Sequence, residues 1–315
     1  MAPRPYKPAT QKTLKTAIGC TGTGLHTGAR VSMTLAPANP GTGIVFRRTD
    51  LAADAGTIAA SWRNVVDTRL CTALGNEHGA RVGTIEHLMA ALYGCEIDNV
   101  IVEIDGPEVP VMDGSAAPFV FLIECAGTVD QAAVRRGIEV RRTIEVVDED
   151  CRLVIEPASG FGLNFEIDFA DTAIARQACE LEFAPGSFKA DLSRARTFGF
   201  VQDIDRLQAA GLARGGSLEN AVVISGNRIL NDDGLRYADE FVRHKMLDCV
   251  GDLYLAGAPL LGQVTALRSG HRHNHKLLTA LFADQGAYRY VDLPDGFIPA
   301  RSLAANAGLG LGAAD

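Results

Sequence analysis

The sequence predicts a two-domain protein in which both halves mix β-strands with α-helices. Its 315 residues are enough for two domains of ordinary size, and either one can bury a core of its own. Hydrophobic residues make up 47% of the chain and charged residues 22%, which is typical of a globular protein. Residues 128–142 are polar and basic, and we place the boundary there, between domains at 1–134 and 135–300.

In the first half, both strands and helices are expected. Runs that alternate in polarity or are rich in Val and Ile predict strands, at residues 29–35, 44–47 and 99–104. Two apolar runs predict helices, at residues 85–93 and 115–125. Thr84 is a suitable N-cap for the first helix, because its hydroxyl can accept a hydrogen bond from a free backbone N–H.

The second half repeats this mixture of elements. Its apolar and alternating runs predict strands at residues 144–147, 152–155 and 163–169. Helices are expected at residues 203–210 and, as the longest helix of the chain, at 238–256. A last helix is expected to start near His275. The tail at 301–315 is rich in Ala and Gly, and we expect it to be flexible.

The net charge of −8 argues against a nucleic-acid partner. Proteins that bind nucleic acids usually carry a basic excess, because phosphate contacts dominate their affinity. The basic clusters of this chain are short, such as Arg135-Arg136 and Arg141-Arg142. An anionic small-molecule substrate stays compatible with this charge, since a few Lys or Arg side chains can reverse the field inside a pocket.

The seven cysteines are scattered and form no Cys-x-x-Cys pair, so neither a disulfide framework nor a cysteine zinc site is indicated. A reducing cytoplasm is therefore the expected location. The first seven residues lack the apolar region of a signal peptide. The apolar run at residues 116–127 is too short to span a bilayer and contains Glu124, so we expect no stable insertion into a membrane.

The helix expected at residues 238–256 carries candidate metal ligands. At about 100° per residue, an apolar stripe forms along one side of this helix, made of Val242, Met246, Cys249, Val250 and Leu253. His244, Asp248 and Asp252 fall on the other side, four residues apart. Side chains at this spacing are close enough for an imidazole and a carboxylate to bind one cation. The alternative is an ordinary solvated polar face.

Two further clusters can complete such a site. Glu86 and His87 open the first predicted helix, where one can bind a metal while the other, a carboxylate, takes a proton from a metal-bound water. The alternative is a Glu favoured by the helix dipole beside a surface His. His271, His273 and His275 form the second cluster, which fits a metal tract, one face of a strand or an exposed loop.

Several long runs of this chain resemble one family of enzymes, the UDP-3-O-acyl-N-acetylglucosamine deacetylases. The matching runs appear in the family's order, and we place them at residues 24–28, 67–72, 84–92, 111–119, 195–200, 241–252 and 269–271. Together they span roughly residues 13 to 290. The resemblance implies a zinc enzyme that removes an acetyl group in the committed step of lipid A synthesis.

The resemblance also implies roles for individual residues. His87, His244 and Asp248 match the zinc ligands, and Glu86 matches the general base. Other residues match groups around the reacting amide: His271 helps expel the amine, Asp252 orients His271, Thr197 holds the oxyanion and Lys245 contacts the substrate. His273 and His275 match no catalytic group, and we interpret them as loop residues. Zinc is the implied cofactor, with Fe²⁺ as the alternative metal.

Substrate contacts are carried over in the same way. Leu25, His26, Phe198, Asp203 and Arg268 match positions near the substrate, and Cys71 matches a position near a second, inhibitory metal. Residues 200–223 correspond to an inserted β-α-β unit that forms a passage for an acyl chain. Four residues of this unit can line the passage or form a small core of their own: Ile204, Leu207, Leu212 and Leu218. Glu156 stands where some members carry a Lys that contacts the substrate.

The implied fold is a two-domain α+β sandwich. Each domain packs a β-sheet against helices, the two helix layers face each other, and the active site lies between the domains. The implied partner is an acylated UDP-N-acetylglucosamine, whose product feeds membrane lipid synthesis, and a monomer is expected. Two other functions compete with this one: a zinc amidase for another N-acetyl sugar, and a non-catalytic protein that binds nucleotide sugars or lipids around a structural metal.

Overall fold

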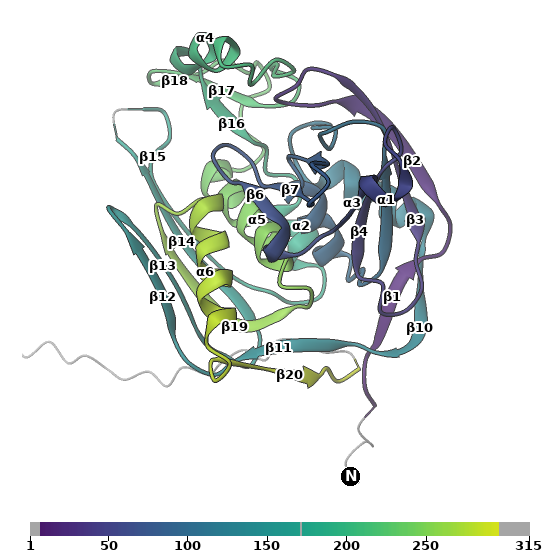
Figure 1. The fold of residues 1–315 in the computed structure, drawn as a ribbon. Coiled ribbons are helices and arrows are strands. Elements are labelled where there is room, and N and C mark those ends of the chain that lie inside the picture. Colours follow the sequence, from purple (N-terminus) through teal and green to yellow (C-terminus); the bar gives the residue numbers. More distant parts are fainter. Residues whose placement is uncertain (1–6, 171, 296–315) are drawn as a thin grey trace, which may run out of the picture.

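The computed structural model describes residues 7–170 and 172–295 and has the α+β fold that the sequence predicts. One set of β-sheets comes from the first half of the chain and another set from the second half. Helices α2 (Glu86–Gly94) and α5 (Glu240–Tyr254) lie between them (Figure 1). The chain passes from the first set to the second between two consecutive strands, β10 (Thr128–Val134) and β11 (Arg136–Val140). The domain limits of 1–134 and 135–300 stay a prediction, and the tail at 301–315 lies outside the described residues.

The first half is built around a five-stranded sheet with the order β2-β3-β9-β4-β5, in which β4 and β9 are parallel. Alternation places the apolar residues of β3 (Val31, Met33 and Leu35) in the core. A second sheet pairs β1 with β10, and a third contains β6, β7 and β8. The strands are β1 Thr10–Leu14, β2 Ile18–Thr23, β3 Arg30–Pro37, β4 Ile44–Arg48, β5 Thr57–Ala59, β6 Val65–Asp67, β7 Ala73–Gly75, β8 Arg81–Val82, β9 Val100–Ile104 and β10 Thr128–Val134.

The second half is built around β19, which pairs with β13 on one side and with β14 on the other. The strands of this seven-stranded sheet are β11 Arg136–Val140, β12 Ile144–Asp148, β13 Cys151–Pro157, β14 Phe161–Phe169, β15 Ala175–Glu182, β19 Leu260–Leu267 and β20 Tyr288–Asp292. A separate three-stranded sheet contains β16 Phe198–Phe200, β17 Val222–Ser225 and β18 Arg228–Ile229. Strands β16 and β17 are parallel and are joined by helix α4, so residues 200–223 do form a β-α-β unit.

The five predicted helices are close to their expected places, with two errors at their starts, and three short helices (α1, η1 and η2) were not predicted. They are α1 Ala53–Gly56, η1 Trp62–Asn64, α2 Glu86–Gly94, α3 Ala117–Ala126, η2 Phe188–Leu192, α4 Val201–Ala209, α5 Glu240–Tyr254 and α6 His271–Ala283. Thr84 is not the N-cap of α2: it has a φ of 54°, and its hydroxyl donates to Glu108 Oε1 at 2.8 Å. Helix α2 begins at Glu86 without a side-chain cap.

Helix α6 begins four residues earlier than expected, so our interpretation of His273 and His275 as loop residues was wrong. Gly270 is the N-cap, and its backbone N–H donates to Nδ1 of His273 at 3.3 Å. His273 is the third residue of the helix. Its ring accepts the hydrogen bond that a Glu or Gln side chain accepts at this position in the usual capping box. His275 Nε2 lies 3.0 Å from the carbonyl oxygen of Trp62, which ties α6 to the first half of the chain.

Helices α2 and α5 approach each other closely because α5 carries Gly251 at the contact. A Cβ atom at this position would overlap the carbonyl oxygen of Glu86 and lie 3.1 Å from the backbone nitrogen of Ala90. One turn further along α5, the hydroxyl of Tyr254 donates to the carbonyl oxygen of Ile97 at 2.8 Å. The absence of a side chain at Gly251 thus brings residues of α5 within reach of the first turn of α2.

Replacing Gly251 with Ala should separate the two helices and destabilise the fold. Overpacking of this kind typically costs about 1–3 kcal/mol, which exceeds the gain of about 1 kcal/mol in helix propensity. Chemical denaturation measures the free energy of unfolding. Gly199→Ala is the matched control, because a Cβ there meets nothing within 4 Å. Equal stability of the two variants would show that the helices do not need a glycine at their contact.

Candidate metal centre and active site

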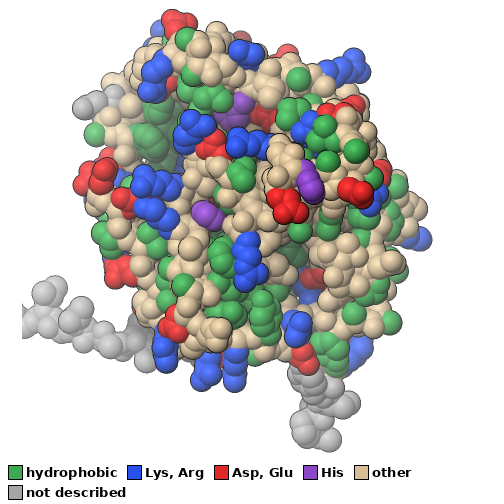
Figure 2. Space-filling model, in the orientation of Figure 1, with side chains coloured by type: hydrophobic (Ala, Val, Ile, Leu, Met, Phe, Trp, Pro, Cys, Tyr) green, Lys and Arg blue, Asp and Glu red, His purple; other side chains and the backbone are tan. Residues whose placement is uncertain are grey.

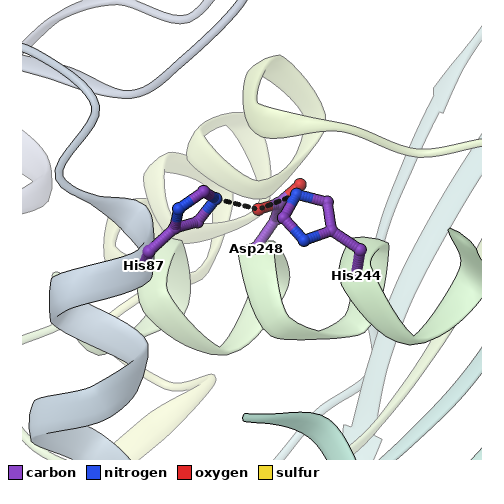
Figure 3. A group of neighbouring side chains, drawn as sticks. All are labelled: His87, His244 and Asp248. Carbon is purple, nitrogen blue, oxygen red and sulfur yellow. Dashed lines mark ion pairs between the residues drawn. The ribbon is translucent and has the colours of Figure 1, made fainter. Parts of the chain in front are cut away.

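Three buried side chains from α2 and α5 converge on one point. They are His87, His244 and Asp248, and their nearest ligand atoms all lie within 4.8 Å of one another. Asp248 Oδ1 lies 3.3 Å from Nε2 of His244 and 3.6 Å from Nε2 of His87 (Figure 3). In Figure 3 the two imidazoles approach this carboxylate from opposite sides, one from each helix. The i, i+4 spacing predicted two of these residues, and the contact between the helices adds the third.

These three residues fit a bound cation. Asp248 Oδ1 is buried and makes no hydrogen bond within the described part of the chain, which is costly for a carboxylate oxygen unless a ligand binds it. Nδ1 of His244 donates to the carbonyl oxygen of Ala195 at 3.1 Å, and this leaves Nε2 as the free lone pair. Burial lowers the pKa of His244 to about 3, so the imidazole is neutral, as a metal ligand must be.

The charges around the three residues favour a divalent cation. Three carboxylates are buried here, those of Glu86, Asp248 and Asp252. The nearby cationic groups are Lys245, whose Nζ lies 2.9 Å from Asp248 Oδ2, and His271. Buried carboxylates need compensating charge, and two His nitrogens with one carboxylate oxygen are typical ligands of Zn²⁺. Lys245 thus contacts a candidate ligand directly, while its ammonium also lies 5.8 Å from the ring centre of Phe198.

Glu86 and His271 face each other beside the candidate ligands. Oε1 of Glu86 lies 4.0 Å from Nε2 of His271, and that nitrogen is also 4.0 Å from Asp248 Oδ2. Burial raises the pKa of Glu86 above its ordinary value. Burial also acts to lower the pKa of His271, but the carboxylates of Asp252, Glu86 and Asp248 outweigh it and raise that pKa to about 9. The pair therefore offers a proton acceptor and a proton donor on one wall.

Asp252 is hydrogen-bonded to His271, the residue that the resemblance pairs with it. Its Oδ2 accepts the Nδ1 proton of His271 at 2.8 Å. Two further donors hold the same carboxylate: Nδ2 of Asn274 bonds to Oδ2 at 2.8 Å, and the hydroxyl of Thr72 bonds to Oδ1 at 2.5 Å. Sequence reasoning missed both donors. Asn274 lies between His273 and His275, and only the helical start at His271 places it on the side that faces Asp252.

The cavity beside these groups has a volume of about 480 Å³. Most of the predicted site residues line it: Leu25, Glu86, His87, Thr197, Phe198, His244, Lys245, Asp248, Arg268 and His271. His273 lines it as well, although no role was expected for this residue. The cavity draws on both halves of the chain, since Leu25, Glu86 and His87 precede the predicted boundary and the other residues follow it.

Backbone hydrogen bonds hold Thr197 at the cavity, and one of them joins the two halves of the chain. Its backbone N–H donates to the carbonyl oxygen of Gly114 at 2.8 Å, and its own carbonyl accepts from Val222 at 2.8 Å. Gly114 has a φ of 83°, and a Cβ there would overlap the carbonyl oxygen of Asn220. The run at residues 111–119, which the sequence singled out, therefore holds the segment that carries Thr197.

Four predicted residues lie outside the cavity lining: Asp252, described above, and His26, Asp203 and Cys71. The backbone N–H of His26 donates to Glu108 Oε1 at 2.8 Å, while its ring nitrogens are buried without a partner among the described residues. Asp203 pairs with Arg206 on α4 at 2.8 Å. Cys71 is half-buried beside the active site, and burial together with the charge of Glu86 raises the pKa of its thiol to about 12. A protonated thiol is a poor metal ligand.

The second-half insertion is open rather than closely packed. No residue of α4 is buried, and Leu218 is 50% exposed. Ile204, Leu207 and Leu212 are half-buried, so the four apolar residues of residues 200–223 do not form a closed core. Figure 2 shows hydrophobic side chains gathered in a hollow at the upper left, below the region of α4 in Figure 1. A small closed core is therefore not observed, and the lining of an acyl passage stays a prediction.

Glu156 and Arg268, which the resemblance linked to the substrate, are both exposed. Glu156 is on β13, and Arg268 comes directly after β19. Glu156 is exposed on β13 opposite Gln263 and does not line the cavity. Arg268 follows β19 with a φ of 52°, and its guanidinium donates to Asp168 Oδ2 at 2.6 Å. A positive φ is rare for a residue with a Cβ and is often found at functional sites. The loop that carries Arg268 thus turns directly into the start of α6 at His271.

Two histidines and an aspartate beside a buried glutamate, at the base of a cavity, define the arrangement of a metal-dependent hydrolase. The comparison with known proteins gives the family. The family profile described as "UDP-3-O-acyl N-acetylglycosamine deacetylase" matches residues 11–283, and the chain belongs to this family.

The chain is similar over nearly its whole length to three proteins named "UDP-3-O-acyl-N-acetylglucosamine deacetylase". It is 49% identical to that of Haemophilus influenzae (strain 86-028NP) over 302 residues, covering 93% of this chain and 99% of the relative. It is 50% identical to that of Myxococcus xanthus (strain DK1622) over 312 residues, covering 99% and 95%. It is also 50% identical to that of Shewanella sp. (strain W3-18-1) over 283 residues, covering 89% and 92%. Within residues 7–170 and 172–295, no helix is long and apolar enough to cross a membrane.

The wild-type protein should bind one Zn²⁺ per chain at the three converging residues. His244→Ala removes one ligand, and we expect the zinc content after dialysis to fall close to zero. His273→Ala is the matched control, because it removes a histidine that lines the same cavity without joining the ligand set. Elemental mass spectrometry measures the bound metal. Full zinc in His244→Ala, or equal loss in both variants, would contradict this assignment of ligands.

Proposed function

We propose that this protein removes the acetyl group from UDP-3-O-(3-hydroxyacyl)-N-acetylglucosamine in a zinc-dependent hydrolysis. The products are UDP-3-O-acyl-glucosamine and acetate, and the reaction is the committed step of lipid A synthesis in a Gram-negative bacterium. The observation that carries this proposal is the convergence of His87, His244 and Asp248 next to Glu86 and His271 in one cavity. The close similarity to proteins named as this deacetylase supplies the substrate.

The metal has one task in this proposal. A zinc ion held by His87, His244 and Asp248 supplies a Lewis acid, which makes a water molecule more acidic and polarises an amide carbonyl. Fe²⁺ is the alternative metal, since histidine and carboxylate ligands suit both ions. The seven cysteines all lie in the described part of the chain and are free thiols, which supports our proposal that the enzyme works in the reducing cytoplasm.

The proton transfers fall to Glu86 and His271. Oε2 of Glu86 is held by the backbone N–H of Thr72 at 3.0 Å, so Oε1 is the oxygen that accepts the proton of the attacking water. The water oxygen first forms a C–O bond to the acetamide carbon, and the C–N bond then breaks as the amine leaves. Nε2 of His271 donates a proton to the departing nitrogen, because the pKa of this imidazole is raised to about 9 and it is charged at neutral pH.

The remaining residues orient groups or bind substrate. The hydroxyl of Thr197 lines the cavity and donates a hydrogen bond to the carbonyl oxygen as negative charge develops on it. Asp252 keeps Nε2 of His271 turned toward the substrate. Lys245 and Arg268 supply positive charge for the UDP group, and Leu25 and Phe198 contact the sugar and the start of the acyl chain. His26 and Asp203 are substrate contacts at the edge of the site, and Cys71 is the place near which an inhibitory second metal binds.

Acetate release from acylated UDP-N-acetylglucosamine tests the proposal. Zinc-loaded protein should release acetate from the acylated substrate and far more slowly from UDP-N-acetylglucosamine without the acyl chain. Equal rates on both compounds would favour an amidase for another N-acetyl sugar. No release above background from either compound, with zinc content verified, would favour a binding protein with a structural metal.

Glu86→Gln and His271→Gln should retain zinc and lose activity. Each removes one proton-transfer group while keeping a side chain of similar size, and general acid or base catalysis is typically worth about 10²- to 10⁴-fold in rate. The measurement is kcat for acetate release, alongside zinc content. His275→Gln is the control, because this residue bonds to Trp62 outside the cavity lining. A near-wild-type kcat in either variant at full zinc would remove that residue from the mechanism.

The metal-free protein should contain a His271 imidazole that titrates near pH 9. The folded pKa lies above the usual 6.5, so His271 is protonated at pH 7 and loses its proton as the pH rises through about 9. NMR titration of the ring of labelled metal-free protein measures this. Asp252→Asn removes the nearest carboxylate, and the pKa should then move down towards 6.5 or below it, because burial remains. An unchanged titration in Asp252→Asn would show that Asp252 does not raise the pKa of His271.

A further inference from the structure

Thr72 contacts both proton-transfer groups of the site, although no role was predicted for it. Its side chain is 2% exposed, and it lies just before β7 in the first half of the chain. Its backbone N–H donates to Glu86 Oε2 at 3.0 Å, and its hydroxyl donates to Asp252 Oδ1 at 2.5 Å. The same hydroxyl oxygen lies 3.3 Å from Nδ1 of His271. One residue thus joins the groups on α2 with those on α5 and α6.

The backbone of Thr72 also fixes the start of α2. Its carbonyl oxygen accepts the N–H of Ile85 at 3.3 Å, while its N–H binds the carboxylate of the next residue, Glu86. Helix α2 has no side-chain cap at its N-terminus. The carbonyl of Thr72 therefore holds Ile85, the residue before α2, and its N–H sets which way the carboxylate of Glu86 points.

The hydroxyl of Thr72 completes the shell of donors around Asp252. Oδ2 of Asp252 accepts from His271 and Asn274, and Oδ1 accepts from the hydroxyl of Thr72. A carboxylate held at both oxygens cannot rotate about its χ2 angle without losing a bond in a buried site. The orientation of the His271 ring thus depends on a hydroxyl that belongs to the other half of the chain.

We propose that Thr72 is a positioning residue for the deacetylation, and that its hydroxyl holds Asp252 so that Nε2 of His271 faces the departing nitrogen. Thr72 touches no reacting atom itself: it does not line the cavity. It acts through Asp252, and its backbone holds the base Glu86 at the same time. The role of Thr72 in the reaction rests on the proposed function, whereas its contacts with Glu86, Asp252 and His271 are seen in the structure.

Thr72→Val tests the hydroxyl while keeping the shape of the side chain. We expect kcat to fall about 10- to 100-fold, the range seen when a group that orients a catalytic residue is removed, with KM within about threefold of wild type. Thr72→Ser restores the hydroxyl and should recover most of kcat. In an Asp252→Ala background, adding Thr72→Val should lower kcat no further, because the hydroxyl then has nothing to hold.

Thr13→Val is the matched control for the loss of a buried hydroxyl. Thr13 is 5% exposed, and its hydroxyl donates to the carbonyl oxygen of Asn99 at 2.7 Å, in the sheets of the first half. We expect this variant to lower Tm while kcat stays at the wild-type value. A kcat for Thr72→Val equal to wild type, or a Thr72→Ser variant as slow as Thr72→Val, overturns the proposal.

A readout without substrate separates this inference from the proposed function. In the metal-free protein, the Nδ1 proton of His271 is bonded to Asp252 and should give a resolved low-field NMR signal. Thr72→Val should broaden or shift this signal, and Thr72→Ser and Thr13→Val should leave it in place. If wild-type protein releases no acetate, the proposed function fails, and the NMR signal alone then decides whether Thr72 positions His271. An unchanged signal in Thr72→Val counts against the proposal.

Discussion

The close contact between helices α2 and α5 is the constraint on which the rest of the site depends. The backbone of Glu86 occupies the space that a side chain at position 251 would need, so the backbones of the two helices are in direct contact there. His87 projects from one helix, and His244 and Asp248 project from the other, so only this close approach brings the three ligand atoms to one point. Oδ1 of Asp248 is buried between the two imidazoles and makes no hydrogen bond among the described residues, so it is suited to bind a cation.

Both halves of the chain supply residues to the proposed active site. The first half supplies Glu86 and the contacts of Thr72, and the second half supplies His271 and Asp252. Gly114 of the first half holds Thr197 of the second through a backbone hydrogen bond. Contacts that cross between the halves therefore orient His271, through Asp252, and Thr197, which ties the activity to the packing of the two sets of sheets.

The sequence predicted the groups that follow a local pattern and missed those that do not. The spacing of His244 and Asp248 indicated a shared face of one helix, but a solvated face fitted the same pattern, and only the fold shows that this face is buried. His87 and Thr72 are distant from these residues in sequence, so no periodicity links them. His87 was a candidate from its place beside Glu86, and the resemblance made it a predicted ligand. Thr72 ends the matching run at residues 67–72 but was given no role, and nothing in the sequence singled out Asn274. The N-cap at Thr84 failed because its hydroxyl binds Glu108 instead.

X-ray diffraction from crystals of the zinc-loaded protein, measured at the zinc absorption edge, tests the central claim most directly. The account predicts one anomalous peak per chain, placed between Nε2 of His87, Nε2 of His244 and the carboxylate of Asp248, at nitrogen and oxygen distances of about 2.0–2.2 Å. A single peak bound to the sulfur of Cys71, or a metal held by residues of only one helix, would contradict the claim that the contact between α2 and α5 assembles the active centre.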